Sequence, residues 1–290
     1  MGGPAIKASK RSAKAIEARR KAEQVNTLDV APFMLKLKEL RNRVIAVLLA
    51  FGLAFGLCFA FAVKIYDFLV IPFSRAAAAR TSALDGVDQE LQLIYTAPLE
   101  FFFVKVKLAL FGGIVLASPV ILFEIYRFIA PSLYKDQKWA VIPYMIFAPV
   151  LFLIGAALAH GVVLPFVMEF ALAQEQSLDQ GRAAIELLPR VADYLAIVVT
   201  LILAFGAAFQ LPVAMSLLAR GGLVDTRGLV ENWKVAVVAA FAFAMFVTPP
   251  DPFSQILLGG ALMALYGVSV VCVWLVERRD AQNAAETDAA

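Results

Sequence analysis

The chain has 290 residues, of which 61% are hydrophobic and only 17% are charged, and its formal net charge is +3. A typical soluble domain is about half apolar and about a quarter charged, so this composition excludes an ordinary soluble protein. Apolar runs long enough to cross a bilayer recur along the chain and indicate an all-α, polytopic membrane protein.

The first part of the chain is basic and rich in alanine. We expect residues 1–30 to form a solvated cytoplasmic tail that touches anionic lipid, with nucleic-acid binding as the weaker alternative. Residues 31–279 are expected to form the membrane domain, and residues 280–290 a short second tail.

Six apolar runs predict six transmembrane helices. In chain order they are Val44–Val63, Phe101–Phe123, Val141–Met168, Leu195–Leu218, Val235–Val247 and Ile256–Val276. Spans five and six are expected to be short. The fifth run would give only about 20 Å of helix at about 1.5 Å per residue, less than a hydrocarbon core of about 30 Å, so the bilayer is expected to thin around it.

The distribution of lysine and arginine predicts the orientation of the spans. Nineteen of them lie in the segment before span one, the 2–3 loop, the 4–5 loop and the last tail, which all fall on one side. The cations in the loops of the other side include Arg75, Arg80, Arg182 and Arg190. The positive-inside rule therefore places both termini in the cytoplasm.

Prolines interrupt three consecutive spans and favour bent helices that form a concave wall, although proline is also common in ordinary membrane helices. They are Pro119, Pro143, Pro149, Pro165 and Pro212. Gln210 lies too deep to reach the interface, so its amide needs a hydrogen-bond partner. A bond within the protein and a bond to a docking partner are equally compatible with the sequence.

No catalytic or metal-binding pattern is present in the sequence. It lacks a phosphate-binding loop, HExxH, GxSxG and paired intramembrane carboxylates. His160 is the only histidine, and Cys58 and Cys272 lie in separate apolar runs, so neither a metal centre nor a disulfide is expected. We expect no cofactor and no enzymatic activity, and any work must draw on an ion gradient or on partner proteins.

Four stretches resemble the TatC family, the core subunits of twin-arginine protein translocases. They are "LKELRNR" before span one, "APLEFFFVKVKLALFGGIVLASPVILFEIYRFIAPSLYKDQ" through span two, "FGAAFQLPVAMSLLA" in span four and "TPPDPFSQ" after span five. The resemblance implies a glove-shaped bundle in the bacterial inner membrane that recognises twin-arginine signal peptides of folded cargo. It also implies single-span partners of the TatA and TatB types, further copies of the chain, and the proton-motive force as the energy source.

The resemblance implies a signal-peptide site on the cytoplasmic face, made from the segment before span one and the 2–3 loop. Its expected residues are Glu39, Leu40, Arg41, Arg43, Phe128, Pro131, Leu133, Tyr134, Asp136, Gln137 and Glu124. A carboxylate suits this task because it can take an arginine guanidinium through two parallel hydrogen bonds, which lysine cannot reproduce.

The sequence departs from the family pattern at the second expected carboxylate. Gln137 occupies a position where the family commonly has glutamate. We therefore expect Glu39 to bind one guanidinium, Asp136 or Glu124 to supply the second carboxylate, and Gln137 to give a weaker neutral contact.

Partner contacts or assembly are expected at the other end of the spans and in span four. The residues are Gln210, Met245, Pro249, Asp251 and Pro72. Asp251 is equally compatible with a rigid turn that caps span six. A secondary transporter or channel is the main competing class, but no internal repeat between the two halves supports it. An intramembrane enzyme lacks a nucleophile and paired acids.

Overall fold

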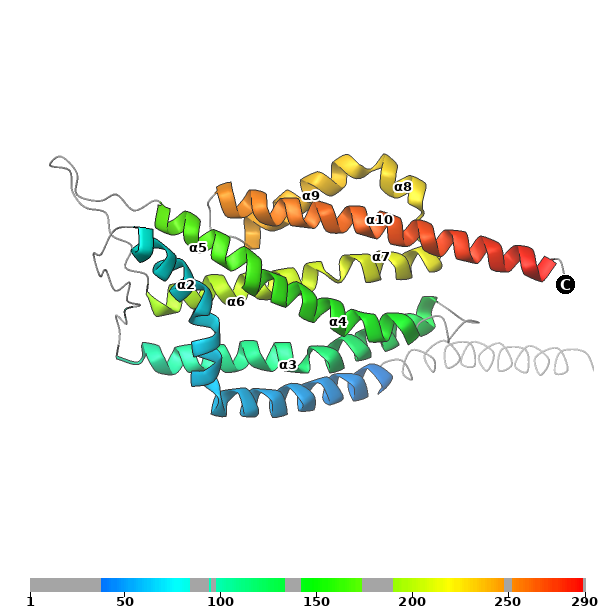
Figure 1. Cartoon of the computed structure of the whole chain (residues 1–290). Helices are drawn as coiled ribbons and strands as arrows, with labels where there is room; N and C mark the ends of the chain where they lie inside the picture. Colours follow the sequence, from blue (N-terminus) through cyan, green and yellow to red (C-terminus); the bar gives the residue numbers. More distant parts are fainter. Residues whose placement is uncertain are drawn as a thin grey trace, which may run out of the picture. The chain divides into compact units, whose positions relative to one another are not determined.

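The computed structural model describes residues 38–83, 94, 98–133, 142–173, 190–247 and 252–288 (Figure 1). The chain divides into two compact units, Met1–Leu49 and Ala50–Ala290. Helices make up almost all of the described part, where the only pairing of extended backbone is an isolated bridge between Ile94 and Arg190. This confirms the prediction of an all-α polytopic membrane protein.

The first helix, Lys38–Ala60, is followed by a turn at Phe61. The remaining elements are α2 (Ala62–Ala83), α3 (Glu100–Leu133), α4 (Ile142–Leu158), the π-helix η2 (Ala159–Val163), α5 (Leu164–Ala173), α6 (Val191–Ala208), α7 (Leu211–Arg220), α8 (Thr226–Glu231), α9 (Trp233–Val247) and α10 (Pro252–Asp288).

Five helical segments are long and apolar enough to cross a membrane. They are Lys38–Ala60, Glu100–Phe128, Ile142–Ala171, Val191–Arg220 and Ser254–Gln282. They match predicted spans one, two, three, four and six. The helix that carries span six is longer than expected, because α10 continues as one helix to Asp288 and takes in residues expected to form a tail.

The fifth predicted span corresponds to α9, which has 15 residues. A helix of this length is about 22 Å long, still shorter than a hydrocarbon core of about 30 Å. Its side chains are mostly exposed, with Phe246 at 84% and Val238 at 69%. The expected short apolar helix is therefore present, and the described part of the chain leaves much of its surface exposed.

Prolines mark two interruptions in the long spans. Pro165 follows the π-helix η2, in which the Leu164 amide bonds five residues back to Ala159. Pro212 lies in the first turn of α7, directly after the break at Phe209 and Gln210 that separates α6 from α7. Since proline has no amide hydrogen, the helical bonding pattern changes at both places.

The main core lies where α2, α3, α5 and α6 meet. Its largest fully buried apolar side chains are Phe205, Leu69, Leu108, Leu164 and Leu201, together with Leu258 of α10. In a bilayer, lipid rather than water surrounds the exposed apolar side chains. Hydrophobic side chains therefore occur both inside and outside the bundle, and close packing is what distinguishes the core.

Small residues allow α4 and α6 to pack closely. A Cβ atom added at Gly155 would lie 2.6 Å from the Phe205 carbonyl oxygen, and one at Gly206 would lie 2.7 Å from the Phe152 ring. The glycines therefore let each helix receive a bulky group of the other, a common feature of membrane helix pairs.

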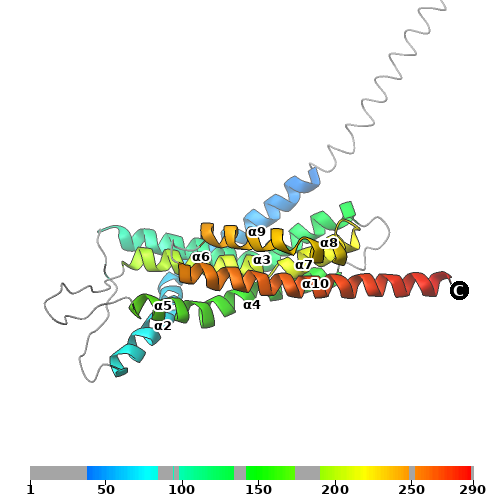
Figure 2. The ribbon, with the colours of Figure 1, turned by 90° about the horizontal axis from the view of Figure 1, so that it is seen from above.

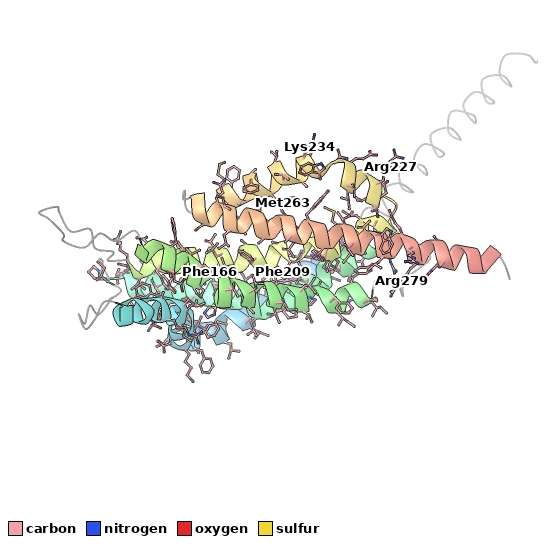
Figure 3. The ribbon with its side chains drawn as sticks, turned by 45° about the horizontal axis from the view of Figure 1, so that its top comes forward. Phe166, Phe209, Arg227, Lys234, Met263 and Arg279 are labelled. Carbon is pink, nitrogen blue, oxygen red and sulfur yellow. The ribbon has the colours of Figure 1, made fainter. Side chains whose placement is uncertain are left out.

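The second half of the larger unit is organised around α10. Figure 1 and Figure 2 show α10 running beside α7, with α8 and α9 also against it, and these three helices all contact α10. Figure 3 shows Arg227 and Lys234, on α8 and the start of α9, pointing away from the helices behind them. The α8 segment thus presents its cations to the surroundings while its other side is held by α10.

Candidate functional site

The first expected motif lies in the first turns of the helix Lys38–Ala60. Glu39, Leu40 and Arg41 are all exposed there. Arg43 donates from its guanidinium to Glu39 Oε1, one helical turn away. The Glu39 side chain is 55% exposed, whereas that of Arg43 is 12% exposed. The pair therefore presents its carboxylate, rather than its guanidinium, to an incoming ligand.

The second expected motif begins at the end of α3. Phe128 is exposed, at 40%, and Pro131 and Leu133 belong to the last turn of the helix. Tyr134, Asp136 and Gln137 lie outside the described residues. The roles of these three residues in binding the second arginine therefore stay predictions.

Glu124 lies one turn before Phe128 on α3. Its side chain is 15% exposed, and its Oε1 atom lies 3.8 Å from an Arg127 guanidinium nitrogen. At this distance the two groups form an ion pair without a short hydrogen bond. Arg127 is the more exposed partner of this pair, at 59%.

The amide of Gln210 makes two hydrogen bonds inside the bundle. Its Nε2 atom donates to the Ala148 carbonyl oxygen at 2.9 Å, and its Oε1 atom accepts from the Tyr126 hydroxyl at 3.4 Å. Tyr126 comes from α3, Ala148 from α4 and Gln210 from the break between α6 and α7. The internal bond, one of the two alternatives left open by the sequence, is therefore present. A role in partner contact stays a prediction.

A small buried cluster surrounds this network. It is formed by Tyr126, Ala148, Val213 and Leu217. An amide in an apolar setting costs less free energy when both of its ends are hydrogen-bonded than when they lack partners. Gln210 thus holds three spans together at the point where the fourth span is broken.

The residues expected to contact partners are distributed over three regions. Met245 lies on α9 and is 58% exposed, and its contact with a partner stays a prediction. Pro249 and Asp251 lie outside the described residues. Pro72 is fully buried inside α2, and its role in partner contact or assembly stays a prediction.

The structure places two polar side chains beside Pro72 that the sequence did not single out for this role. His160 Nε2 lies 3.1 Å from the Phe68 carbonyl oxygen, and the Tyr194 hydroxyl donates to the Leu69 carbonyl oxygen at 2.8 Å. Pro72 was the available signal, because a proline leaves the carbonyl four residues before it without a helical donor. Sequence alone does not show which side chain fills that place.

The described residues contain no group of three or more His, Cys, Asp or Glu side chains that could hold a metal ion. Cys58 and Cys272 are both free thiols. The described residues offer instead an exposed carboxylate at Glu39 and extensive exposed apolar helix surface.

Comparisons with known proteins identify the class. The family model described as "Sec-independent protein translocase protein (TatC)" matches residues 36–260. A TatC protein of Magnetococcus marinus is 37% identical over 259 residues, which are 89% of this chain and 90% of the relative. A TatC protein of Helicobacter pylori strain J99 is 34% identical, over 87% of this chain and 94% of the relative.

A solved structure gives the same result. The crystal structure described as "Twin Arginine Translocase Receptor- TatC" matches with a TM-score of 0.69 and 32% identity, covering 83% of this chain and 99% of that one. The fold and the matched motifs define a polytopic membrane component of a protein-transport system. The chain belongs to the TatC family of Sec-independent protein translocases.

Proposed function

We propose that the chain is the receptor for twin-arginine signal peptides and the core scaffold of a translocase that exports folded proteins across the cytoplasmic membrane. The observation that carries the proposal is the exposed Glu39 carboxylate, presented by the first helix within a motif that matches the family. In this proposal the protein acts by binding and has no catalytic centre of its own.

The energetics of the Glu39–Arg43 pair favour exchange with a peptide arginine. An exposed i,i+4 pair contributes only about 0.3–0.5 kcal/mol, so a ligand loses little by displacing it. A bidentate, charge-assisted bond to a peptide guanidinium is worth about 1.5–3 kcal/mol. Arg43, the less exposed partner, would keep the carboxylate oriented until the peptide arrives.

The second arginine is expected to be read at the 2–3 loop, by Asp136 or Glu124 with a neutral contact from Gln137. Glu124 supports this model because its carboxylate lies on α3, one turn before Phe128, and forms a 3.8 Å ion pair with the exposed Arg127. Phe128, exposed on the same helix, would offer an apolar contact next to it.

The proposed orientation has both termini in the cytoplasm, following the excess of Lys and Arg on that side. Reporter fusions after residue 290 and within residues 174–189 test it. A cytoplasmic reporter should be active only in the first fusion and a periplasmic reporter only in the second. The reverse pattern would contradict the orientation.

The proposed partners are TatA- and TatB-type single-span proteins and further copies of this chain, with the proton-motive force as energy source. The short helix α9 supports a partner role, because Met245 and Phe246 expose apolar surface at 58% and 84%. Pro249, Asp251 and Gln210 are proposed to contribute to the same assembly.

Photo-crosslinking from positions 39 and 137 tests the receptor function directly. A twin-arginine signal peptide should be labelled from both positions in membrane vesicles, whereas the twin-lysine form should be labelled about tenfold less, the effect of about 1.4 kcal/mol. Equal labelling of the two peptides would contradict the model.

A further inference from the structure

A pocket of about 410 Å³ opens between the first turns of α3 and the start of α6. Figure 1 and Figure 2 show these two helices beginning at the same end of the larger unit, and they contact each other. The described residues that line the pocket are Leu99, Glu100, Phe103, Val104, Lys107, Arg190, Ala192 and Asp193. None of them is among the residues expected to bind peptides or partners. We call this space the α3–α6 pocket.

The lining of the α3–α6 pocket carries charges of both signs. Lys107 and Arg190 are cations and Glu100 and Asp193 are carboxylates, so their formal charges sum to zero. Lys107 and Asp193 are exposed, and within the described part of the chain neither side chain has an ion-pair or hydrogen-bond partner. An unpaired cation on α3 and an unpaired carboxylate on α6 thus border the same space.

The backbone holds the mouth of the pocket in place. The Val191 amide donates to the Ile94 carbonyl oxygen at 3.1 Å, and Ile94 and Arg190 form the isolated bridge. Val104 is buried, so the floor of the pocket is packed, whereas Phe103 is 58% exposed at its edge. The pocket therefore combines a fixed mouth with an apolar edge.

The four charged residues lie at the level of a membrane interface. The two spans begin at Glu100 and Val191. Arg190 and Asp193 lie within one helical turn of the second start. The first of these spans has 29 residues, about 43 Å, and when centred it exceeds a hydrocarbon core of about 30 Å by about 6 Å at each end. Lys107 lies about 10 Å along α3, so its flexible stem can bring the ammonium group to the interface.

A ligand with one charge of each sign suits this lining. A simple anion would be repelled by the two carboxylates, and a simple cation would be repelled by Lys107 and Arg190. A zwitterion can place each of its charges beside the opposite one. At a membrane interface this description fits a zwitterionic phospholipid headgroup.

We propose that the α3–α6 pocket binds phosphatidylethanolamine of the adjacent leaflet, which is the outer leaflet in the proposed orientation. The phosphate lies beside Lys107 and Arg190, and the ammonium group lies beside Asp193 and Glu100. The start of an acyl chain contacts the exposed Phe103 ring.

The carboxylates make the pocket selective among phospholipids. A primary ammonium group has three N–H donors that Asp193 and Glu100 can accept, as they would accept from a lysine. The trimethylammonium group of phosphatidylcholine has no N–H donor, and phosphatidylglycerol has no cation at all. All three lipids carry the phosphate, so Lys107 contributes to the affinity for each of them.

Native mass spectrometry of the intact protein tests the site, after release from nanodiscs that hold equal amounts of phosphatidylethanolamine, phosphatidylcholine and phosphatidylglycerol. The unmodified protein should retain one phosphatidylethanolamine in preference to the other two lipids. Asp193→Asn should lower the preference over phosphatidylcholine about tenfold, because a charge-assisted bond to the ammonium group is lost. Lys107→Ala should lower the retention of all three lipids about fivefold, the effect of one basic residue.

Two control variants remove the same kinds of group elsewhere. Asp67→Asn changes an exposed carboxylate of α2, and Lys105→Ala removes a lysine of α3, and neither residue lines the pocket. Both variants should retain the three lipids like the unmodified protein. Equal retention of the three lipids by the unmodified protein would overturn the proposal. An unchanged preference in Asp193→Asn would also overturn it, as would the same losses in the control variants.

A second measurement uses only the unmodified protein. Phosphatidylethanolamine with a photoactivatable group at the start of one acyl chain should label residues 99–103, at the start of α3. Unlabelled phosphatidylethanolamine should suppress this label at about one tenth of the concentration that phosphatidylcholine requires. Label spread evenly over the exposed apolar helices, or equal suppression by the two lipids, would contradict a site that reads the ammonium group.

Discussion

His160 donates a hydrogen bond from Nε2 to the carbonyl oxygen of Phe68, across 3.1 Å between η2 and α2. A carbonyl can only accept, so this ring nitrogen carries the hydrogen. Phe68 lies four residues before Pro72, whose missing amide hydrogen would have bonded to the same oxygen in a regular helix. The chain's one histidine thus replaces the donor that Pro72 removes.

The first prediction follows from this replacement. His160→Phe keeps the ring stacked on Phe68 but removes the donor, leaving the carbonyl oxygen without its partner. We expect the variant to lose about 1–2 kcal/mol of stability, the cost of a carbonyl oxygen left without a partner where lipid or detergent surrounds the helices. Thermal unfolding of the purified protein in detergent measures this as a lower midpoint.

Pro72→Ala supplies the control, because alanine restores the amide that can bond to Phe68. The stability lost through His160→Phe should therefore be clearly smaller in a protein that also carries Pro72→Ala than in the protein with Pro72. Equal losses in both backgrounds would show that His160 stabilises the protein by packing alone.

The membrane fold could be read from the sequence because a bilayer imposes a simple rule. Every backbone polar group must be bonded inside its own helix, so apolar runs such as 101–123 and 195–218 predict spans directly. The end of α10 was harder to predict. Its apolar run stops near Val276, but the helix continues through charged residues to Asp288, and hydropathy carries no signal for such a continuation.

The polar contacts between spans are harder to predict from the sequence than the spans themselves. Gln210 could be identified as a side chain in need of a partner, because it lies deep in span four. Its actual partners, Tyr126 and the Ala148 carbonyl, depend on how three helices pack, and that information is not contained in any local pattern. The same limit applies to His160 and Phe68, which are 92 residues apart.

The second prediction concerns the Tyr126–Gln210 contact. Tyr126→Phe removes one donor, and Gln210→Ala removes both of the amide's bonds. Each hydrogen bond lost is expected to cost about 0.6 kcal/mol on average and at most about 1.7 kcal/mol, as between other membrane helices. Because the two residues share one bond, the double variant should lose less than the sum of the single losses. Thermal unfolding of the unmodified protein, the two single variants and the double variant gives the four stabilities of this double-mutant cycle.

This cycle also separates the internal role of Gln210 from a role in partner contact. If Gln210 acts only inside the bundle, Gln210→Ala and Tyr126→Phe should reduce crosslinking to TatA- and TatB-type partners in proportion to their loss of stability. A much larger reduction for Gln210→Ala would show a direct contact with a partner. Strictly additive stability losses would contradict the shared hydrogen bond.

The third prediction concerns the missing carboxylate at position 137. Gln137→Glu should tighten binding of a twin-arginine signal peptide about tenfold, because a charge-assisted bond replaces a neutral one. A binding titration with fluorescent peptide and the purified protein measures the change. The twin-lysine peptide should gain clearly less, since an ammonium group cannot make the bidentate contact.

Glu39→Gln is the matching variant at the first motif, because it removes a carboxylate where Gln137→Glu adds one. It keeps the size of the side chain and removes the charge, so binding of the twin-arginine peptide should weaken about tenfold. An unchanged affinity for Gln137→Glu would place the reading of the second arginine elsewhere. An unchanged affinity for Glu39→Gln would refute the first motif as a binding site.

The fourth prediction concerns the attachment of α8 to α10. Glu277 accepts from the Thr226 amide at 2.8 Å through Oε1 and from the Thr226 hydroxyl through Oε2. Its carboxylate therefore caps the start of α8 from a neighbouring helix, and Tyr266 adds a bond to the Leu229 carbonyl at 2.7 Å. These bonds hold α8 and the start of α9 in place.

Glu277→Gln removes the charge from this cap and replaces one acceptor oxygen with a donor that faces the Thr226 amide or hydroxyl. We expect a loss of about 1–2 kcal/mol, as for a lost helix cap, and faster proteolysis of the segment around Arg227 and Lys234. Glu231→Gln is the control, because Glu231 makes an exposed pair with Arg227 that contributes at most about 0.5 kcal/mol. Equal rates of cleavage in the two variants would show that Glu277 does not hold α8 against α10.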